Sequence, residues 1–559
     1  QGCDPLAQTQ RSKLQHRRAR INQQINKEMR MRAGAENLFS EAINVPMIPL
    51  GLKETKEVDF TVSIQDFICE HYGEDCSLYD KEIKELMELR QAMRTPSRNQ
   101  AGLELLMEYY NQMYYLDQRF FPLHRNLGVH FHWYDSLTGV PSCQRTLAFE
   151  KGSVLFNIGA LYTQIGARQD RSATAGIDKA IDAFQRAAGA FNYLKDNFSN
   201  APSLDMSGPS LCMLVRLMVA QVQECVFERV TLTTQDTHLT SQLRLAQEAA
   251  RVSDVYLLVQ QTMAQPLMKD YVPFSWASMV QVKSEHFRAL SHYYAAVALC
   301  DHTLSTEEED EEEEGGDEET EKAFLHFYIN VPAGPPLSQV LRDPEKRRKL
   351  GKAHLRRAVI RHEEAMRVHS LCKILRKMDI LQDVLSLTHK RSLDKYSELD
   401  REDDFDETAE APEIQSQTHQ KPDITPPNFS TVQVTDIFQR LGPLSVFCAR
   451  ARWGPTRVIC LQRREGGLGL TLRGDSPVLV AGVVPGGCAA VEKRAIMLSH
   501  SSDKENTRQR LLGGAKGQSS ASLLNWNRKK KREGGGVTKR LGSTFSLSFG
   551  SIRDTEAMY

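Results

Sequence analysis

Hydrophobic residues recur at helical spacing through most of the chain between Asp59 and Glu398. In one stretch, spacings of three and four repeat for about five turns, at Ile177, Ile181, Phe184, Ala188, Phe191 and Leu194. Small residues in the same stretch would let neighbouring helices approach closely, namely Ala180, Ala183, Ala187 and Gly189. The pattern predicts a packed helix there. Similar patterns predict helices over 79–94, 100–118, 147–167, 210–232, 238–263, 276–303 and 346–389.

One interruption of this helical pattern predicts a β hairpin. Val129 to Trp133 is β-prone, and the glycine of Leu137-Thr138-Gly139 supplies a turn before Val140. No fixed-period repeat is evident, so the expected fold is mainly α, an α-solenoid-like array with a short β hairpin. The most apolar run, Leu211 to Val222, is broken by Arg216. It falls short of the roughly 18 apolar residues of a membrane span, and none is predicted.

The first part of the chain predicts a separate helix from about Ser12 to Asn37. Leu14, Ile21, Ile25 and Met29 fall on one narrow stripe, as in a coiled-coil seam, while eight Lys/Arg residues surround it within residues 1–40. A helix this basic needs a partner helix rather than a place in a core. The next stretch, Asn44 to Leu50, holds two prolines and cannot supply that partner.

Beyond residue 398 the pattern changes twice. Residues 399–430 combine acids with four prolines and predict an interdomain linker. Short β-prone runs separated by glycines follow, at 457–461, 468–472 and 478–484, and predict the start of a small β module. From about Ser499 no period survives among Ser, Gly, Lys and Arg, so residues 491–559 are expected to form a disordered basic tail.

Composition narrows the protein class. The chain has 559 residues, and its 71 basic and 71 acidic residues cancel. Locally the charge is polarised, with twelve carboxylates and no base over 307–321, which predicts a solvated acidic loop. The eleven cysteines are scattered singly without a CxxC pair, a usage typical of reduced thiols, so we expect a cytoplasmic protein.

Motifs that carry chemistry are missing from the sequence. It contains no phosphate-binding P-loop, zinc-helix, nucleophile-elbow or kinase motif, so we expect no enzyme and no cofactor. His130 and His132 lack further ligands at metal spacing, and His354, His362 and His369 are expected at the surface of a basic helix. The run from Arg528 to Arg532 predicts a solvated basic tail that is open to peripheral membrane contact; no nucleic acid is expected.

Several stretches resemble one known family. These are Cys3-Asp4-Pro5-Leu6-Ala7-Gln8-Thr9, the segment 31–38, and Phe149 through Leu161, together with the Ala220-Gln221-Val222-Gln223-Glu224 segment. The sequence is similar to the rhophilins, which are Rho-binding adaptors. The resemblance implies a basic helical hairpin of the Rho-effector (REM) type, a Bro domain of the Alix kind and a PDZ domain. It assigns 3–40 to a partial REM-type helix, 46–398 to the Bro domain and 431–490 to a partial PDZ-like module.

Two departures from the family layout weaken what the resemblance implies. The hairpin stops after Leu38-Phe39 and resumes at 41–43, in what looks like the linker to the Bro domain, so its second helix is missing. The resemblance therefore implies a weakened contact with a GTP-bound Rho-type GTPase, through candidate residues Arg17, Arg18, Ile21, Ile25 and Lys27. The PDZ resemblance stops near 488–490. Its carboxylate-loop remnant, Gly467, Leu468, Gly469 and Leu470, lacks the opposite groove wall, and we expect no binding of C-terminal peptides.

Two functions of different kinds follow from the resemblance. The first is a non-catalytic adaptor that binds Rho-type GTPases in signalling to the actin cytoskeleton. The alternative is a membrane-remodelling adaptor whose Bro domain docks tail helices of ESCRT-III proteins. The family's helix-binding groove carries over to Val226, Arg229, Leu239 and Leu243. The i, i+4 spacing of the two leucines would present an apolar stripe to a ligand helix, although leucines at this spacing are also typical of a core.

Overall fold

The computed structural model describes residues 44–122, 127–198, 202–234, 238–301, 324, 326–329, 337–400, 410–450, 469–473, 479–485 and 487. All of them belong to the first of two compact units, which spans residues 1–509. The predicted helix over 12–37, the acidic loop over 307–321 and the basic tail lie outside the described residues.

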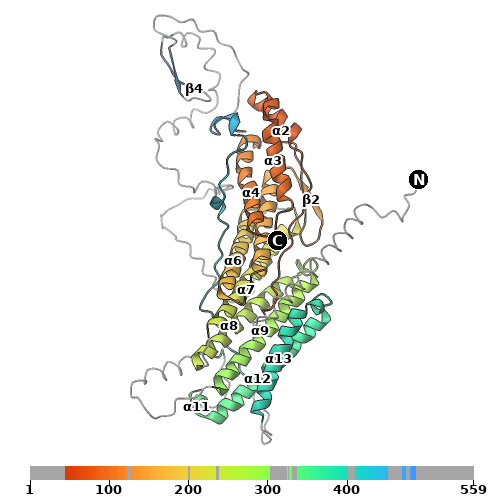
Figure 1. The fold of residues 1–559 in the computed structure, drawn as a ribbon, viewed down its shortest axis with the longest axis vertical. Helices are drawn as coiled ribbons and strands as arrows, with labels where there is room; N and C mark the ends of the chain where they lie inside the picture. The colour runs from red at the N-terminus through yellow and green to blue at the C-terminus, as the bar shows by residue number, and fades with distance from the viewer. Residues whose placement is uncertain are drawn as a thin grey trace, which may run out of the picture. The chain divides into compact units, whose positions relative to one another are not determined.

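Helices dominate the described residues, as the hydrophobic periodicity predicts. They are α2 (Thr61–Phe67), α3 (Asp80–Met93), α4 (Gln100–Phe120), α5 (Leu147–Ala167), α6 (Thr174–Asn197), α7 (Gly208–Thr233), α8 (Leu239–Met263), α9 (Phe274–Cys300), α11 (Leu337–Arg342), α12 (Pro344–Leu371) and α13 (Asp379–Leu399). From α4 to α9 each helix packs against the next, and α12 packs against both α9 and α13 (Figure 1). This chain of neighbours confirms the expected α-solenoid-like array.

Short 3₁₀ or π segments occur between some of the helices and, after α13, within residues 410–450. They are η1 (Ile68–Tyr72), η2 (Cys76–Tyr79), η3 (Leu204–Met206), η4 (Leu375–Lys377), η5 (Phe429–Thr431) and η6 (Gln439–Leu441). The expected hairpin is present as β1 (Phe131–Tyr134) and β2 (Pro141–Gln144), paired antiparallel with Phe131 opposite Gln144. Gly139 in its turn has a φ of 71°, a conformation that glycine adopts without strain.

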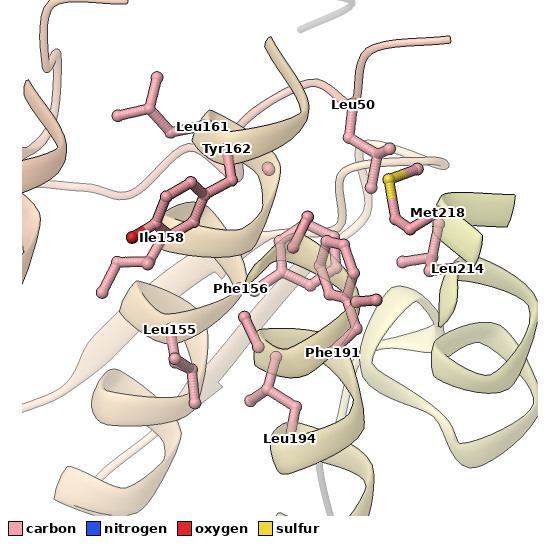
Figure 2. Close-up of a cluster of buried hydrophobic side chains, with 14 of the residues drawn as sticks. Leu50, Leu155, Phe156, Ile158, Leu161, Tyr162, Phe191, Leu194, Leu214 and Met218 are labelled. Carbon is pink, nitrogen blue, oxygen red and sulfur yellow. The ribbon is translucent and has the colours of Figure 1, made fainter. Parts of the chain in front are cut away.

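The centre of the core lies where α5, α6 and α7 meet. Figure 2 shows Phe156 of α5, Phe191 of α6 and Met218 of α7 in one cluster of buried side chains. Close approach there depends on Gly159, where an added Cβ would lie 2.9 Å from Cε1 of Phe191. Helix α7 meets the length and composition of a membrane span, yet 83% of its apolar window is buried inside the protein, which is typical of a core helix.

The single helix predicted over 346–389 is two helices. Helix α12 ends at Leu371, where Cys372 adopts an extended conformation, and α13 begins at Asp379. Neither proline nor glycine marks this break. Cys372 and Leu375 are buried in the turn, so the chain reverses in order to pack α13 against α12. Tertiary packing, rather than local sequence, ends the helix.

The segment 410–450 also differs from the expectation of a linker over 399–430 followed by a separate module. Asn111 of α4 donates to the carbonyl oxygens of Phe429 at 2.9 Å and Val432 at 2.7 Å. A Cβ on Gly189 would collide with the backbone of Thr425. This glycine therefore allows residues 410–450 to approach α6, and not a neighbouring helix as the sequence predicted. We call residues 410–450 the strap, because they run along the helices as part of the same core.

One buried ion pair fastens the strap to α4. Nε of Arg119 lies 2.7 Å from Oδ2 of Asp436, and the same guanidinium donates to the carbonyl oxygens of Phe447 and Gly442 at 3.0 Å each. Both charged side chains are nearly excluded from solvent. Such a pair is costly to break because the remaining charge stays buried without its partner.

We expect Asp436→Ala to lower the free energy of unfolding by about 3 kcal/mol, because it leaves Arg119 buried and uncompensated. Urea denaturation of the full chain would measure the change. Asp423→Ala, at an exposed position of the same strap, is the matched control and should have little effect. Equal stability of the two variants would show that the pair of Arg119 and Asp436 does not stabilise the folded domain.

Candidate functional site

The Ala220-Gln221-Val222-Gln223-Glu224 segment lies in the middle of α7 with all five residues buried. Oε1 of Gln221 accepts a hydrogen bond from the backbone N–H of Ile48 at 2.6 Å. Nε2 of Gln223 donates to Oγ1 of Thr418 at 2.8 Å. The two glutamines therefore attach the N-terminal segment and the strap to the same helix. We call the five residues the α7 clamp.

The glutamate of the clamp makes the third attachment. Its carboxylate accepts from Nζ of Lys283 in α9 at 2.6 Å and from the hydroxyl of Tyr256 in α8. Lys283 is fully buried, and burial lowers the pKa of its ammonium group, while the facing carboxylate of Glu224 opposes that effect. The clamp thus holds α7, α8 and α9 together through one buried charge pair.

A second ion pair lies beside the clamp. Nη1 of Arg171 lies 2.5 Å from Oε1 of Glu228, and Nη2 donates to the carbonyl oxygen of Val45 at 2.6 Å. Burial raises the pKa of Glu228 to about 7, against the attraction of Arg171. Perturbed carboxylates of this kind are common at active sites. Here the carboxylate is closed off from solvent and faces a base, so the arrangement serves packing.

Comparison with known proteins agrees with this fold. Residues 47–456 match the BRO1-like domain family. The chain is 54% identical to human Rhophilin-1 over 88% of this chain and 78% of that protein. The chain is a member of the rhophilin family. It is also 48% identical to dog Rhophilin-2, over 86% of this chain and 75% of the relative. A solved Bro1 structure concerned with endosomal targeting has the same fold, with a TM-score of 0.50 and 19% identity over 72% of this chain and 97% of that one.

These matches confirm the predicted rhophilin membership and the Bro domain. Rhophilins and BRO1-like proteins are adaptor families, which makes an interaction surface the relevant kind of site. Within the described part of this rhophilin, no group of three or more His, Cys, Asp or Glu side chains could hold a metal ion. The family match continues to residue 456 and so includes the strap.

The predicted helix-binding groove is not assembled in this rhophilin. Val226, Leu239 and Leu243 are 1%, 2% and 3% exposed, so they belong to the core and present no apolar stripe. Leu239 and Leu243 pack in a cluster that also contains Phe324, Phe327, Tyr328, Leu341 and Ile414. Arg229 alone reaches the surface, where its Nη1 lies 2.8 Å from Oδ1 of Asp178. The i, i+4 spacing of the leucines thus reflects packing against α9.

The other candidate residues lie mostly outside the described part of the rhophilin. This applies to Arg17, Arg18, Ile21, Ile25 and Lys27 of the REM-type helix, and to Gly467 and Leu468 of the PDZ-like loop. Gly469 is described and has a φ of 68°. It precedes β3 (Leu470–Arg473), which pairs antiparallel with β4 (Leu479–Val483), with Leu470 opposite Val483. These described residues form a bulged two-stranded hairpin.

The histidines expected at the surface are buried. His354 and His362 have no exposed surface and His369 is 6% exposed. Nδ1 of His354 lies 2.8 Å from Nδ1 of His292 in α9, and Nε2 of His354 lies 2.9 Å from the hydroxyl of Tyr328. The basic residues of α12 misled the prediction, because several of them, Arg347, Arg348 and Lys352, are themselves buried in the same helix as the histidines, which packs on α9. The matching histidines His286 and His292 in α9 were the missed signal.

We expect Leu243→Asp to lower the free energy of unfolding by at least about 3 kcal/mol, since it places a charge in an apolar cluster. Thr240→Asp, on the exposed face of the same helix, is the control and should stay within about 0.5 kcal/mol of the parent. Chemical denaturation followed by circular dichroism would measure both. A stable Leu243→Asp protein would contradict the core assignment and restore the groove.

We also expect stability to fall as the pH is lowered from about 6.5 to about 5, where unfolded histidine gains its proton. Burial lowers the pKa of His286 and His354 to about 3 and of His362 to about 2, and lowers that of His292 well below its usual range. Unfolding therefore takes up protons. Glu228, with its raised pKa, acts in the opposite direction. The net slope is at most about 4 kcal/mol per pH unit, from about three protons.

Urea unfolding between pH 5 and pH 7.5 would measure this slope. His362→Gln should remove about one proton from it. A slope that is independent of His362 would contradict the buried, neutral state of this imidazole.

Proposed function

We propose that this rhophilin is a non-catalytic, cytoplasmic adaptor that binds Rho-type GTPases in signalling to the actin cytoskeleton. The observation that carries the proposal is its 54% identity to human Rhophilin-1 across 88% of the chain. In the proposed arrangement, the basic helix within residues 3–40 contacts the GTP-bound GTPase. The Bro domain serves as the ordered body, and its tightly paired interior suits a scaffold.

The proposal includes weak GTPase binding. The segment that resembles the REM hairpin lacks the second helix. The first helix must therefore become ordered as it binds, and this ordering reduces the net affinity. Docking of ESCRT-III tail helices is the alternative function. The burial of Leu239 and Leu243 removes the contact residues expected for it and makes it the less favoured of the two.

We expect the full chain to bind GTP-loaded Rho in preference to GDP-loaded Rho. The affinity should be more than about tenfold below that of a chain whose hairpin is completed with a second helix of the kind that the family resemblance implies. Isothermal titration calorimetry with both nucleotide states would measure it. Arg17→Glu with Arg18→Glu should weaken binding further. Lys529→Glu with Lys530→Glu makes the same charge change in the tail and should not.

A parallel pull-down with ESCRT-III tail peptides separates the two functions. Retention of those peptides without GTP-loaded Rho would overturn the proposal in favour of the alternative. Affinity for GTP-loaded Rho equal to that of the completed hairpin would leave the adaptor function standing but contradict the weakening.

A further inference from the structure

Five large apolar side chains are exposed at two turns of the Bro domain. In the α8–α9 turn, residues 264–273, and at the start of α9, Leu267 is 69%, Tyr271 38% and Phe274 68% exposed. At the end of α12 and in the α12–α13 turn, residues 372–378, Leu371 is 63% and Ile374 61% exposed. Large apolar residues exposed together, rather than singly, indicate an interaction surface.

The two turns lie at the same end of their helices. Helices α9 and α12 are antiparallel: His292 faces His354, and about two turns along, the rings of His286 and His362 lie 5.8 Å apart. Continuing this register brings Phe274 level with residue 373. The η4 segment of the α12–α13 turn also packs against α9, and Figure 1 shows both turns at one end of this helical layer. We call the pair of turns the apolar tip.

Buried neighbours hold the tip in place. Met268 and Val272 anchor the first turn, and Cys372 and Leu375 anchor the second. The backbone N–H of Met268 donates to Gln265 at 2.8 Å, and that of Arg376 donates to Cys372 at 3.0 Å. Because the anchors point inward, the intervening apolar side chains must point outward. The exposed residues are therefore fixed in position rather than exposed by a loose loop.

The tip is basic on the side of the α12–α13 turn, where Leu371 and Ile374 lie. The α12–α13 turn carries exposed Lys373, Arg376 and Lys377 and no acid; the nearest acids, Asp379 and Asp383, begin α13. The α8–α9 turn is neutral, with Lys269 beside Asp270. Apolar side chains bordered by bases are typical of protein surfaces that insert shallowly into anionic membranes.

We infer that the apolar tip rests on an anionic bilayer. Leu371, Ile374 and Phe274 would enter the boundary between headgroups and acyl chains, while the three bases of the α12–α13 turn would meet lipid phosphates and carboxylates. A bilayer suits this surface better than a peptide does, because the apolar side chains protrude from turns and can insert between lipids. This contact is separate from any made by the basic tail and does not depend on GTPase binding.

Sedimentation of the full chain with phosphatidylcholine vesicles, with and without phosphatidylserine, tests the inference. Leu371→Ser with Ile374→Ser should weaken binding to the anionic vesicles at least about tenfold, since two aliphatic side chains no longer enter the bilayer. Leu387→Ser with Leu393→Ser is the matched control, at positions 55% and 43% exposed on α13. It should bind as the parent does.

A second pair of variants separates local charge from net charge. The change of Lys373, Arg376 and Lys377 to Glu should weaken binding to anionic vesicles strongly. The change of exposed Lys81, Lys84 and Lys179 to Glu alters the net charge equally and should weaken it less. Thermal melting of each variant verifies that it is folded. All variants keep the basic segments at both ends of the chain.

Equal vesicle binding by the parent and the Leu371→Ser, Ile374→Ser variant would overturn the inference. So would capture of a soluble protein by the tip with no tip-dependent vesicle binding, since that result would assign the surface to a protein partner. Loss confined to the tip variants, and only with anionic lipid, would support it.

Discussion

The buried pair of Glu224 and Lys283 is the interaction on which the domain's arrangement depends. Both side chains have no exposed surface, and Nζ of Lys283 lies 2.6 Å from Oε2 of Glu224. A charge buried this completely is tolerated only when its partner stays in place, and removing one member typically costs about 3–5 kcal/mol. That is a large share of the roughly 5–15 kcal/mol that stabilises a folded domain. Helices α7 and α9 are therefore tied in one register.

The neighbouring glutamines extend this constraint to both ends of the domain. Gln221 binds Ile48 near its beginning, and Gln223 binds Thr418 in the strap. These partners are 173 and 195 residues away in the chain. About one turn of a single helix thus selects the positions of three elements. A domain whose central helices are held by buried polar contacts has little freedom to open at its centre. Its ends and surface turns are therefore the places where partners would bind.

Sequence reasoning was strongest where a pattern is local. The helices over 147–167 and 238–263 and the hairpin at Gly139 follow from spacing and turn chemistry, and the structure reproduces them closely. It failed where the deciding contact is distant. The proline-rich strap reads as a linker, and the basic residues of α12 make its histidines look exposed. Arg119 and Asp436, which reveal the strap's role, are 317 residues apart and carry no signal of pairing.

The sequence by itself determined the family, through the resemblance of particular segments. It also determined the mainly helical class and the periodic faces, because spacing and residue type act over neighbouring turns. Only the tertiary structure decided which apolar residues are covered. Leu239 and Leu371 are equally hydrophobic and both lie in helices, yet one is 2% and the other 63% exposed. The difference arises because Phe324, Phe327 and Leu341 pack in the same cluster as Leu239 and cover it. Whether a side chain is buried depends on which distant residues pack against it, and helical spacing does not encode those contacts.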